Sequence, residues 1–155
     1  MTLLALETRS KNAVDNCHDA SPVLHGDAQV SAALRRQYPG AIHRPTPACY
    51  TYNCHGLTFA SRRTQILLSA DVRRILGDDD YVQIGTKDVL AGDIVIYIGE
   101  DGDIEHSGIV MDVPKGMLVV IPKVLSKWGS AHEVVHNVLD CPYKSARIEY
   151  YRVHK

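Results

Sequence analysis

The chain has 155 residues, of which 45% are hydrophobic and 23% are charged, proportions that are ordinary for a globular domain. Its 17 lysines and arginines against 18 aspartates and glutamates give a formal net charge of -1, so no overall field draws the chain to nucleic acid. No apolar run approaches the roughly 20 residues that span a bilayer. We therefore expect a single domain, residues 1–155, with neither a nucleic acid nor a membrane as its partner.

The first residues, MTLLALETRSK, lack a basic leader and meet Glu7 directly after a short apolar run. This pattern does not fit a secretory signal, so we expect a protein that is cytoplasmic as synthesised. The four cysteines are too few and too irregularly spaced for a disulfide-rich secreted scaffold. Reduced thiols are the expected state.

The N-terminal third is polar and contains one expected helix, Ala28 to Gln37. Pro45 and Pro47 then indicate a loop or an extended approach. We therefore divide the chain into an N-terminal extension, residues 1–45, and a core, residues 46–155.

The apolar spacing after Gly56 predicts one helix and then a second that begins near Ser69. Ser69 is the expected N-cap of the second helix, and Gly77 is expected just past its end.

The rest of the chain has the β-branched and aromatic composition of strands, interrupted by turn signals. GDIVIYI and IEHSGIVMDV, separated by EDGD, predict a hairpin, and MLVVIPKVLSKWG predicts a third strand in which Pro122 indicates an edge position or a bulge. EVVHNV and RIEYYRV supply two more strands. The expected fold is α+β, with N-terminal helices packed on an antiparallel sheet of about five strands.

Two segments contain candidate catalytic residues. Cys54, in YNCHGLTFAS, would start a helix, where free backbone N–H groups and the helix dipole favour a thiolate. His106, in IEHSGIV, would lie on a strand, with Gly108 two residues on, where a missing side chain lets another element such as the Cys54 helix pack closely. A thiol beside an imidazole is the arrangement of a nucleophile and its base in acyl transfer. His55 points elsewhere around the helix and is expected at the rim.

These motifs, a cysteine at a helix start followed by LAGDIVIY and HSGIV, resemble the NlpC/P60 group of papain-like cysteine peptidases. The resemblance covers roughly residues 52–152 and implies a papain-like fold, with Cys54 as the nucleophile and His106 as its base. It also implies a third polar residue on the next strand that orients the imidazole.

Ser126 is the nearest match to that third position. If the hairpin turns at Lys115, His106 pairs near residues 124–126, where Ser126 would accept an N–H from the imidazole. His136, in EVVHNV, is the alternative orienting residue.

The order of the motifs, with Cys54 before His106, is opposite to that of the permuted papain-like lipid acyltransferases. This order favours hydrolysis of an amide, and the expected function is that of a thiol peptidase or amidase. The resemblance points to a peptide or peptidoglycan-like substrate and needs no cofactor. The settings that fit are a bacterial toxin or effector, with an inhibitor or immunity protein as partner, a lytic enzyme and a housekeeping hydrolase.

Two other classes compete with the enzyme hypothesis. A catalytically inactive papain-like domain would keep the fold and bind a partner. A zinc module would use some of the cysteines and histidines, but Cys49 and Cys54 have no matching second pair of ligands, and His132 and His136 would not converge on a strand. We therefore expect no metal.

Overall fold

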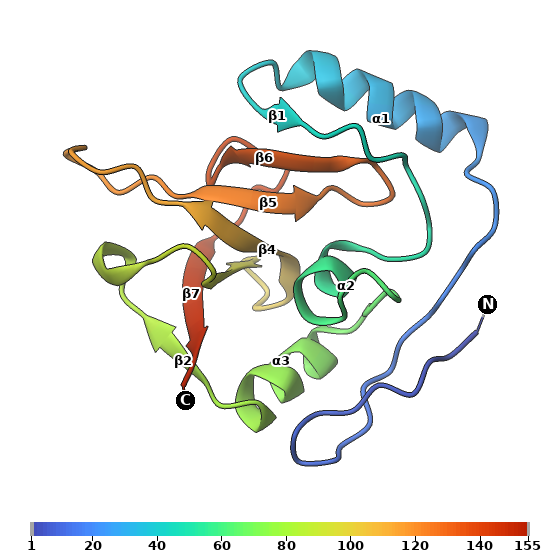
Figure 1. Cartoon of the computed structure of the whole chain (residues 1–155), viewed down its shortest axis with the longest axis horizontal. Coiled ribbons are helices and arrows are strands. Elements are labelled where there is room, and N and C mark those ends of the chain that lie inside the picture. Colours follow the sequence, from blue (N-terminus) through green and yellow to red (C-terminus); the bar gives the residue numbers. More distant parts are fainter. Residues whose placement is uncertain (1, 155) are drawn as a thin grey trace.

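The computed structural model describes residues 2–154 and has an α+β architecture (Figure 1). Its α-helices are α1 (His25–Gln37), α2 (Cys54–Phe59) and α3 (Ser69–Asp78), with a short 3-10 helix at Thr86–Asp88. Its strands are β1 (Ile42–His43), β2 (Tyr81–Ile84), β3 (Ile94–Ile98), β4 (Ile104–Asp112), β5 (Lys123–Lys127), β6 (Glu133–Asn137) and β7 (Arg147–Val153). No helix within the described residues is long and apolar enough to cross a membrane.

The strands form one antiparallel sheet in the order β1-β6-β5-β4-β3-β7-β2. The α+β class is therefore confirmed, but the expected number of about five strands is wrong because the sheet has seven. The two additional strands, β1 and β2, lie at the two edges. β7 is inserted between β3 and β2, so the strands do not form a simple meander.

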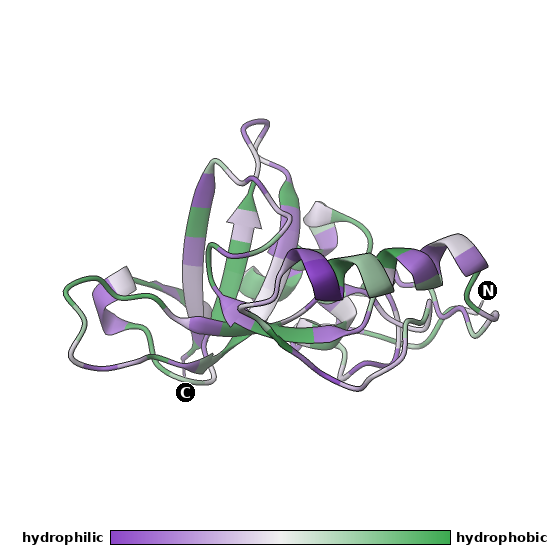
Figure 2. Cartoon of the chain, turned by 90° about the horizontal axis from the view of Figure 1, so that it is seen from above, coloured by the Kyte–Doolittle hydropathy of each residue, from purple (hydrophilic) through white to green (hydrophobic). Residues whose placement is uncertain are grey.

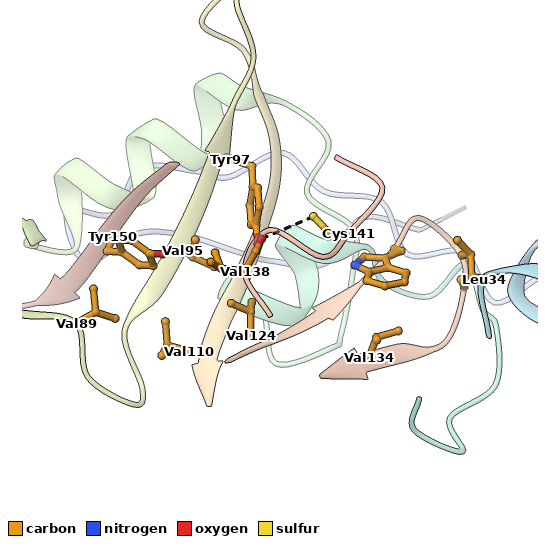
Figure 3. Close-up of a cluster of buried hydrophobic side chains, with 12 residues drawn as sticks. Leu34, Val89, Val95, Tyr97, Val110, Val124, Val134, Val138, Cys141 and Tyr150 are labelled. Carbon is orange, nitrogen blue, oxygen red and sulfur yellow. Dashed lines mark hydrogen bonds between the residues drawn. The ribbon is translucent and has the colours of Figure 1, made fainter. Parts of the chain in front are cut away.

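β3 is buried along its whole length, because the sheet is covered on both of its faces there. Ile94, Ile96 and Ile98 pack with the apolar side of α3, whereas Val95 and Tyr97 contribute to the opposite core. Figure 3 shows this second cluster, which Leu34 of α1 joins. Hydrophobic residues accordingly follow the strands through the centre of the molecule, while α1 carries polar residues along much of its surface (Figure 2).

The segment before residue 46 is part of both cores. Leu34 joins the core beneath α1, and Val14 is buried with the residues of α3. Strand β1 also pairs with β6 at the sheet edge. Helix α1 begins at His25, three residues before the expected start.

Helix α2 is short, and the sequence explains both its ends. The Asn53 side chain accepts a hydrogen bond from the Gly56 amide (2.9 Å) and so caps the first turn. A Cβ at Gly56 would lie 1.9 Å from the Thr64 carbonyl oxygen, so only glycine allows this approach. Ser61 and Arg62 then adopt left-handed φ values of 50° and 64°, which end the helix earlier than the apolar spacing indicates.

Helix α3 begins at Ser69, but its capping differs from the prediction. Leu68 occupies the cap position, where no side chain bonds the helix, and Ser69 Oγ instead accepts the backbone N–H of Ile104 (2.9 Å). Gly77 lies inside the helix, which ends at Asp78. The serine therefore attaches α3 to the start of β4 and does not cap its own helix.

The pairing of β4 with β5 is shifted from the predicted register. Ile109 lies opposite Leu125, so the midpoint of the turn falls at Met117, two residues beyond Lys115. Residues 117–122 are not in a strand, and Pro122 lies just before β5, an interior strand of the sheet. Of the two alternatives inferred from Pro122, the edge position is wrong, because the interior strand starts after the proline, whereas an irregularity in the β4–β5 pairing does lie next to it, between Val110 and Asp112.

Candidate functional site

Cys54 is the first residue of α2 and lies against β4. Side-chain hydrogen bonds hold the helix there: Ser107 Oγ of β4 bonds His55 Nδ1 (2.7 Å) and Thr58 Oγ1 (3.1 Å), and Thr58 Oγ1 also donates to the Cys54 carbonyl (2.9 Å). His55 is 4% exposed, so the predicted rim position is wrong. This histidine fixes the Cys54 helix to the strand that bears His106.

The environment of the Cys54 sulfur combines burial with favourable dipoles. Burial raises the pKa of the thiol to about 11, against smaller lowering effects from the backbone amides of Ser107, His55 and Cys54 and from the Lys127 ammonium. The amides are the donors expected at a helix start and at the neighbouring strand. The resting group is therefore a neutral thiol. If the sulfur becomes negatively charged, backbone N–H groups are in place to stabilise it.

A chain of hydrogen bonds, which we call the site network, connects His106, Ser126 and His136. Ser126 Oγ lies 3.0 Å from His106 Nε2 and 2.8 Å from His136 Nε2. His136 Nδ1 lies 2.7 Å from the Asn137 carbonyl oxygen. The structure thus brings both candidate orienting residues to His106, Ser126 by direct contact and His136 behind it.

The direction of each hydrogen bond in the site network follows from its last acceptor. The Asn137 carbonyl can only accept, so His136 carries its proton on Nδ1 and its Nε2 accepts from the Ser126 hydroxyl. Ser126 Oγ then accepts the Nε2–H of His106. This leaves the lone pair on His106 Nδ1, a buried atom with no hydrogen-bond partner within residues 2–154.

The imidazole of His106 is therefore in the form of a base. Burial lowers its pKa well below the usual value, and the nearby His136 and His55 lower it further. The backbone N–H of Ser107, the residue after His106, bonds the Cys54 sulfur and lowers the pKa of the thiol. No hydrogen bond joins this sulfur to His106 Nδ1. Helix α2 therefore presents a neutral Cys54 thiol near the backbone of β4, and β4 carries the neutral His106 imidazole.

Gly108 allows β5 to reach His106. A Cβ at this position would lie 2.5 Å from Val124 Cγ1, 2.8 Å from the Leu125 oxygen and 3.0 Å from Ser126 Oγ. The close approach that we expected for the Cys54 helix is therefore made by β5. It brings Ser126 to the imidazole diagonally, although the register predicted for a direct pairing was wrong.

Tyr143, which the sequence did not single out, covers the imidazole. Its ring stacks on His106 with the centroids 4.0 Å apart and the planes at 8°. It belongs to the segment between β6 and β7, outside any strand. Cys54 is only 7% exposed and His106 is fully buried, so the site is closed.

A cavity of about 240 Å³ lies beside the start of α2. Its lining includes Tyr50, Tyr52, Asn53 and Leu67, together with Gly129 of the turn after β5. Asn53 lines the cavity, whereas Cys54, the next residue, is buried and does not line it.

A charged cluster near the cavity was also absent from the sequence prediction. Glu133 is 1% exposed and binds Arg62 through two bonds (2.6 and 3.0 Å) and the Tyr52 hydroxyl (2.5 Å). Burial raises the pKa of Glu133, but these partners outweigh it, and the net shift is downward. EVVHNV resembles any half-buried strand, so no sequence signal distinguishes this glutamate.

The residues weighed as zinc ligands do not converge. Among residues 2–154, no group of three or more histidine, cysteine or acidic side chains is arranged to hold a metal ion. His136 belongs to the site network, and His132 bonds Ser31 and His43 instead.

No family model matches the chain, and no curated protein or solved structure matches it. The likeness to the NlpC/P60 group therefore rests on the sequence motifs around Cys54 and His106.

Proposed function

We propose that this protein is a cysteine hydrolase that cleaves an amide bond, with Cys54 as the nucleophile and His106 as the general base. The observation that carries the proposal is the unbonded Nδ1 of His106, which the site network leaves with its lone pair free. A buried lone pair without a partner is costly in a protein interior, and a catalytic role is one reason for a protein to retain it.

The reaction starts from neutral partners because burial disfavours the thiolate. His106 Nδ1 takes the thiol proton as Cys54 Sγ forms a bond to the carbonyl carbon. The imidazolium then protonates the leaving amine, the C–N bond breaks, and an acyl-enzyme remains. Water, deprotonated by the same nitrogen, attacks the thioester and releases the acid and the free thiol.

The remaining groups stabilise charge. Ser126 and His136 hold the Nε2–H of His106 and so support the imidazolium that forms. The backbone amides of Cys54 and Ser107 act on the sulfur and are candidates for oxyanion donors, each such donor contributing about 2.7–4 kcal/mol in enzymes that use them.

Substrate entry requires the site to open. Tyr143 covers His106, and Cys54 is buried next to Asn53, a residue that lines the 240 Å³ cavity. We infer that the segment bearing Tyr143 moves aside when substrate fills the cavity. The family likeness suggests a peptide or peptidoglycan-like amide, within a toxin, a lytic enzyme or a housekeeping hydrolase, and a toxin would have an immunity protein as partner.

Covalent probes test the proposal before any substrate has been identified. A library of peptidyl vinyl sulfones is incubated with the protein, and the modified residue is identified by peptide mass spectrometry. We expect labelling of Cys54 that is lost in Cys54→Ala and His106→Ala and kept in the matched control Cys17→Ala. The best probe sequences then define amide substrates for turnover assays. Labelling of Cys54 that is independent of His106 would contradict the base assignment.

The closed site favours one competing function, an inactive papain-like domain that binds a partner. The 7% exposure of Cys54 and its raised pKa are the observations behind it. The same library separates the two, because an inactive domain would show no His106-dependent labelling with any probe.

A further inference from the structure

Lys127 is a buried cation that the proposed mechanism leaves unused. It is 0% exposed at the end of β5, whereas lysine is rarely buried unless it is paired. Its ammonium donates to the carbonyls of Cys49 (3.0 Å) and Gly129 (3.2 Å) and lies 5.0 Å from the centre of the Tyr52 ring. Within residues 2–154 no carboxylate forms an ion pair with it.

The position of Lys127 connects it to the candidate site. It follows Ser126, and its acceptors Cys49 and Gly129 both line the cavity next to the start of α2. Its charge acts on Cys54 and lowers the thiol's pKa. The ammonium therefore lies within the electrostatic environment of the nucleophile.

The nearest buried anion does not cancel this charge. Glu133 forms ion pairs with Arg62 (2.6 Å) and Arg44 (3.6 Å), so two cations already face one carboxylate. Burial lowers the pKa of Lys127 overall, while Glu133, and the thiolate forms of Cys49 and Cys54 when they arise, favour its charged form. The surroundings of the thiol thus carry an excess of positive charge.

A hydrophobic side chain of similar length would fill the same space without the cost of burying a charge. The two hydrogen bonds alone would explain Lys127 as a clamp between the segment before α2 and the turn after β5. A clamp needs N–H donors but no charge, so the two roles can be separated.

We propose that Lys127 is a positioning residue whose buried ammonium stabilises the negative charge that develops on Cys54 during the reaction. This inference rests on the proposed function, but its measurement needs no substrate. A nearby opposite charge shifts a pKa by about 1–3 units. Since alkylation below the thiol's pKa follows the thiolate fraction, loss of this charge slows it about tenfold for a shift of about one unit.

The experiment measures the alkylation rate of Cys54 by iodoacetamide between about pH 7 and 9, with each cysteine followed by mass spectrometry. Lys127→Gln removes the charge but keeps N–H donors, Lys127→Met removes both, and Lys127→Arg keeps the charge. Lys123→Gln, on the same strand, is the matched control. The rate at the buried Cys141 reports any opening of the fold.

We expect an about tenfold slower reaction of Cys54 in Lys127→Gln and Lys127→Met, near-native rates in Lys127→Arg and Lys123→Gln, and no change at Cys141. If Lys127→Met does not fold, Lys127→Gln alone carries the comparison. A native rate and pH profile in Lys127→Gln would overturn the proposal and leave Lys127 a clamp, whatever the outcome of the turnover assays. Absence of turnover with a tenfold effect on Cys54 would instead count against the proposed function alone.

Discussion

Two hydrogen-bonded chains of serine and histidine run through this protein, and they differ in how they end. The site network ends at the unbonded Nδ1 of His106. The second chain, which we call the α1 network, joins Ser31 to His132 Nδ1 (2.6 Å) and His132 Nε2 to His43 Nδ1 (2.7 Å) beneath helix α1.

The α1 network also has a fixed direction. His43 Nε2 donates to the Tyr38 carbonyl (2.7 Å), so His43 Nδ1 accepts from His132, and His132 Nδ1 accepts from the Ser31 hydroxyl. All four ring nitrogens are bonded, and the chain ties α1 and β1 to the residue before β6. A hydrogen-bonded histidine is therefore no sign of catalysis by itself, and the free lone pair is what distinguishes His106.

The largest expected difference between the networks is in turnover. His106→Asn removes the base and should lower kcat/KM by about 10²- to 10⁴-fold, while folding is kept. His132→Asn should leave kcat/KM near the native value and lower the unfolding free energy, because it breaks the tie to α1. Both are measured with the amide substrates from the probe library and by urea denaturation. Equal losses of turnover in the two variants would show that the site network and the α1 network do not differ in their importance for turnover.

The next largest effect is loss of stability in acid. Burial, with the charges of Arg35, His43 and Lys127, lowers the pKa of His132 from 6.5 to about 4. The unfolded chain then binds a proton near pH 6.5 that the folded chain refuses until about pH 4, so the contribution of His132 to the unfolding free energy falls as pH drops through this window and levels off below it. His55, whose pKa burial lowers to about 4, acts in the same direction.

Chemical denaturation at a series of pH values measures this slope. His132→Asn should make the slope shallower between about pH 6.5 and 4, because one titrating group is removed. An unchanged slope in that variant would show that the pKa of His132 is not lowered in the folded protein.

A smaller effect is expected at Gly108, where the backbones of β4 and β5 approach closely and bring Ser126 to His106. Gly108→Ala places a methyl group against Val124 and the Leu125 oxygen, and should cost about 3 kcal/mol while moving Ser126 from His106. Gly77→Ala, in α3, is the matched control, since a Cβ there meets nothing within 4 Å. It should be neutral or stabilise by about 0.5–1 kcal/mol. Urea denaturation measures both, and equal stabilities would contradict the close packing at Gly108.

The sequence pattern predicted the parts of the fold that depend on local composition. The β-branched and aromatic composition of GDIVIYI and IEHSGIVMDV, with the turn signal EDGD between them, located β3 and β4. β1 and β2 were missed because one has two residues and the other is half exposed. The insertion of β7 beside β3 is a long-range pairing, which no local pattern records.

The same limit applies to the candidate site. Cys54 and His106 were found because each lies in a local motif that has its own chemical meaning. Tyr143 and Lys127 lie in segments with ordinary composition, and they reach the site only through the folding of the chain around β4 and β5. The shifted register also shows that Ser126 was placed next to His106 by an argument that was wrong in detail.

The smallest expected difference concerns the two serines. Ser31→Ala leaves His132 Nδ1 without its donor and should lower the unfolding free energy by about 1–2 kcal/mol with kcat/KM unchanged. Ser126→Ala should cost a similar amount of stability, because two imidazole nitrogens lose their partner, but it should also lower kcat/KM, since His106 is no longer held in its tautomer. Urea denaturation and turnover measured on the same preparations separate the two effects. A fall in kcat/KM for Ser31→Ala as large as that for Ser126→Ala would mean that the α1 network acts on the site through β6, and the two networks would then be one.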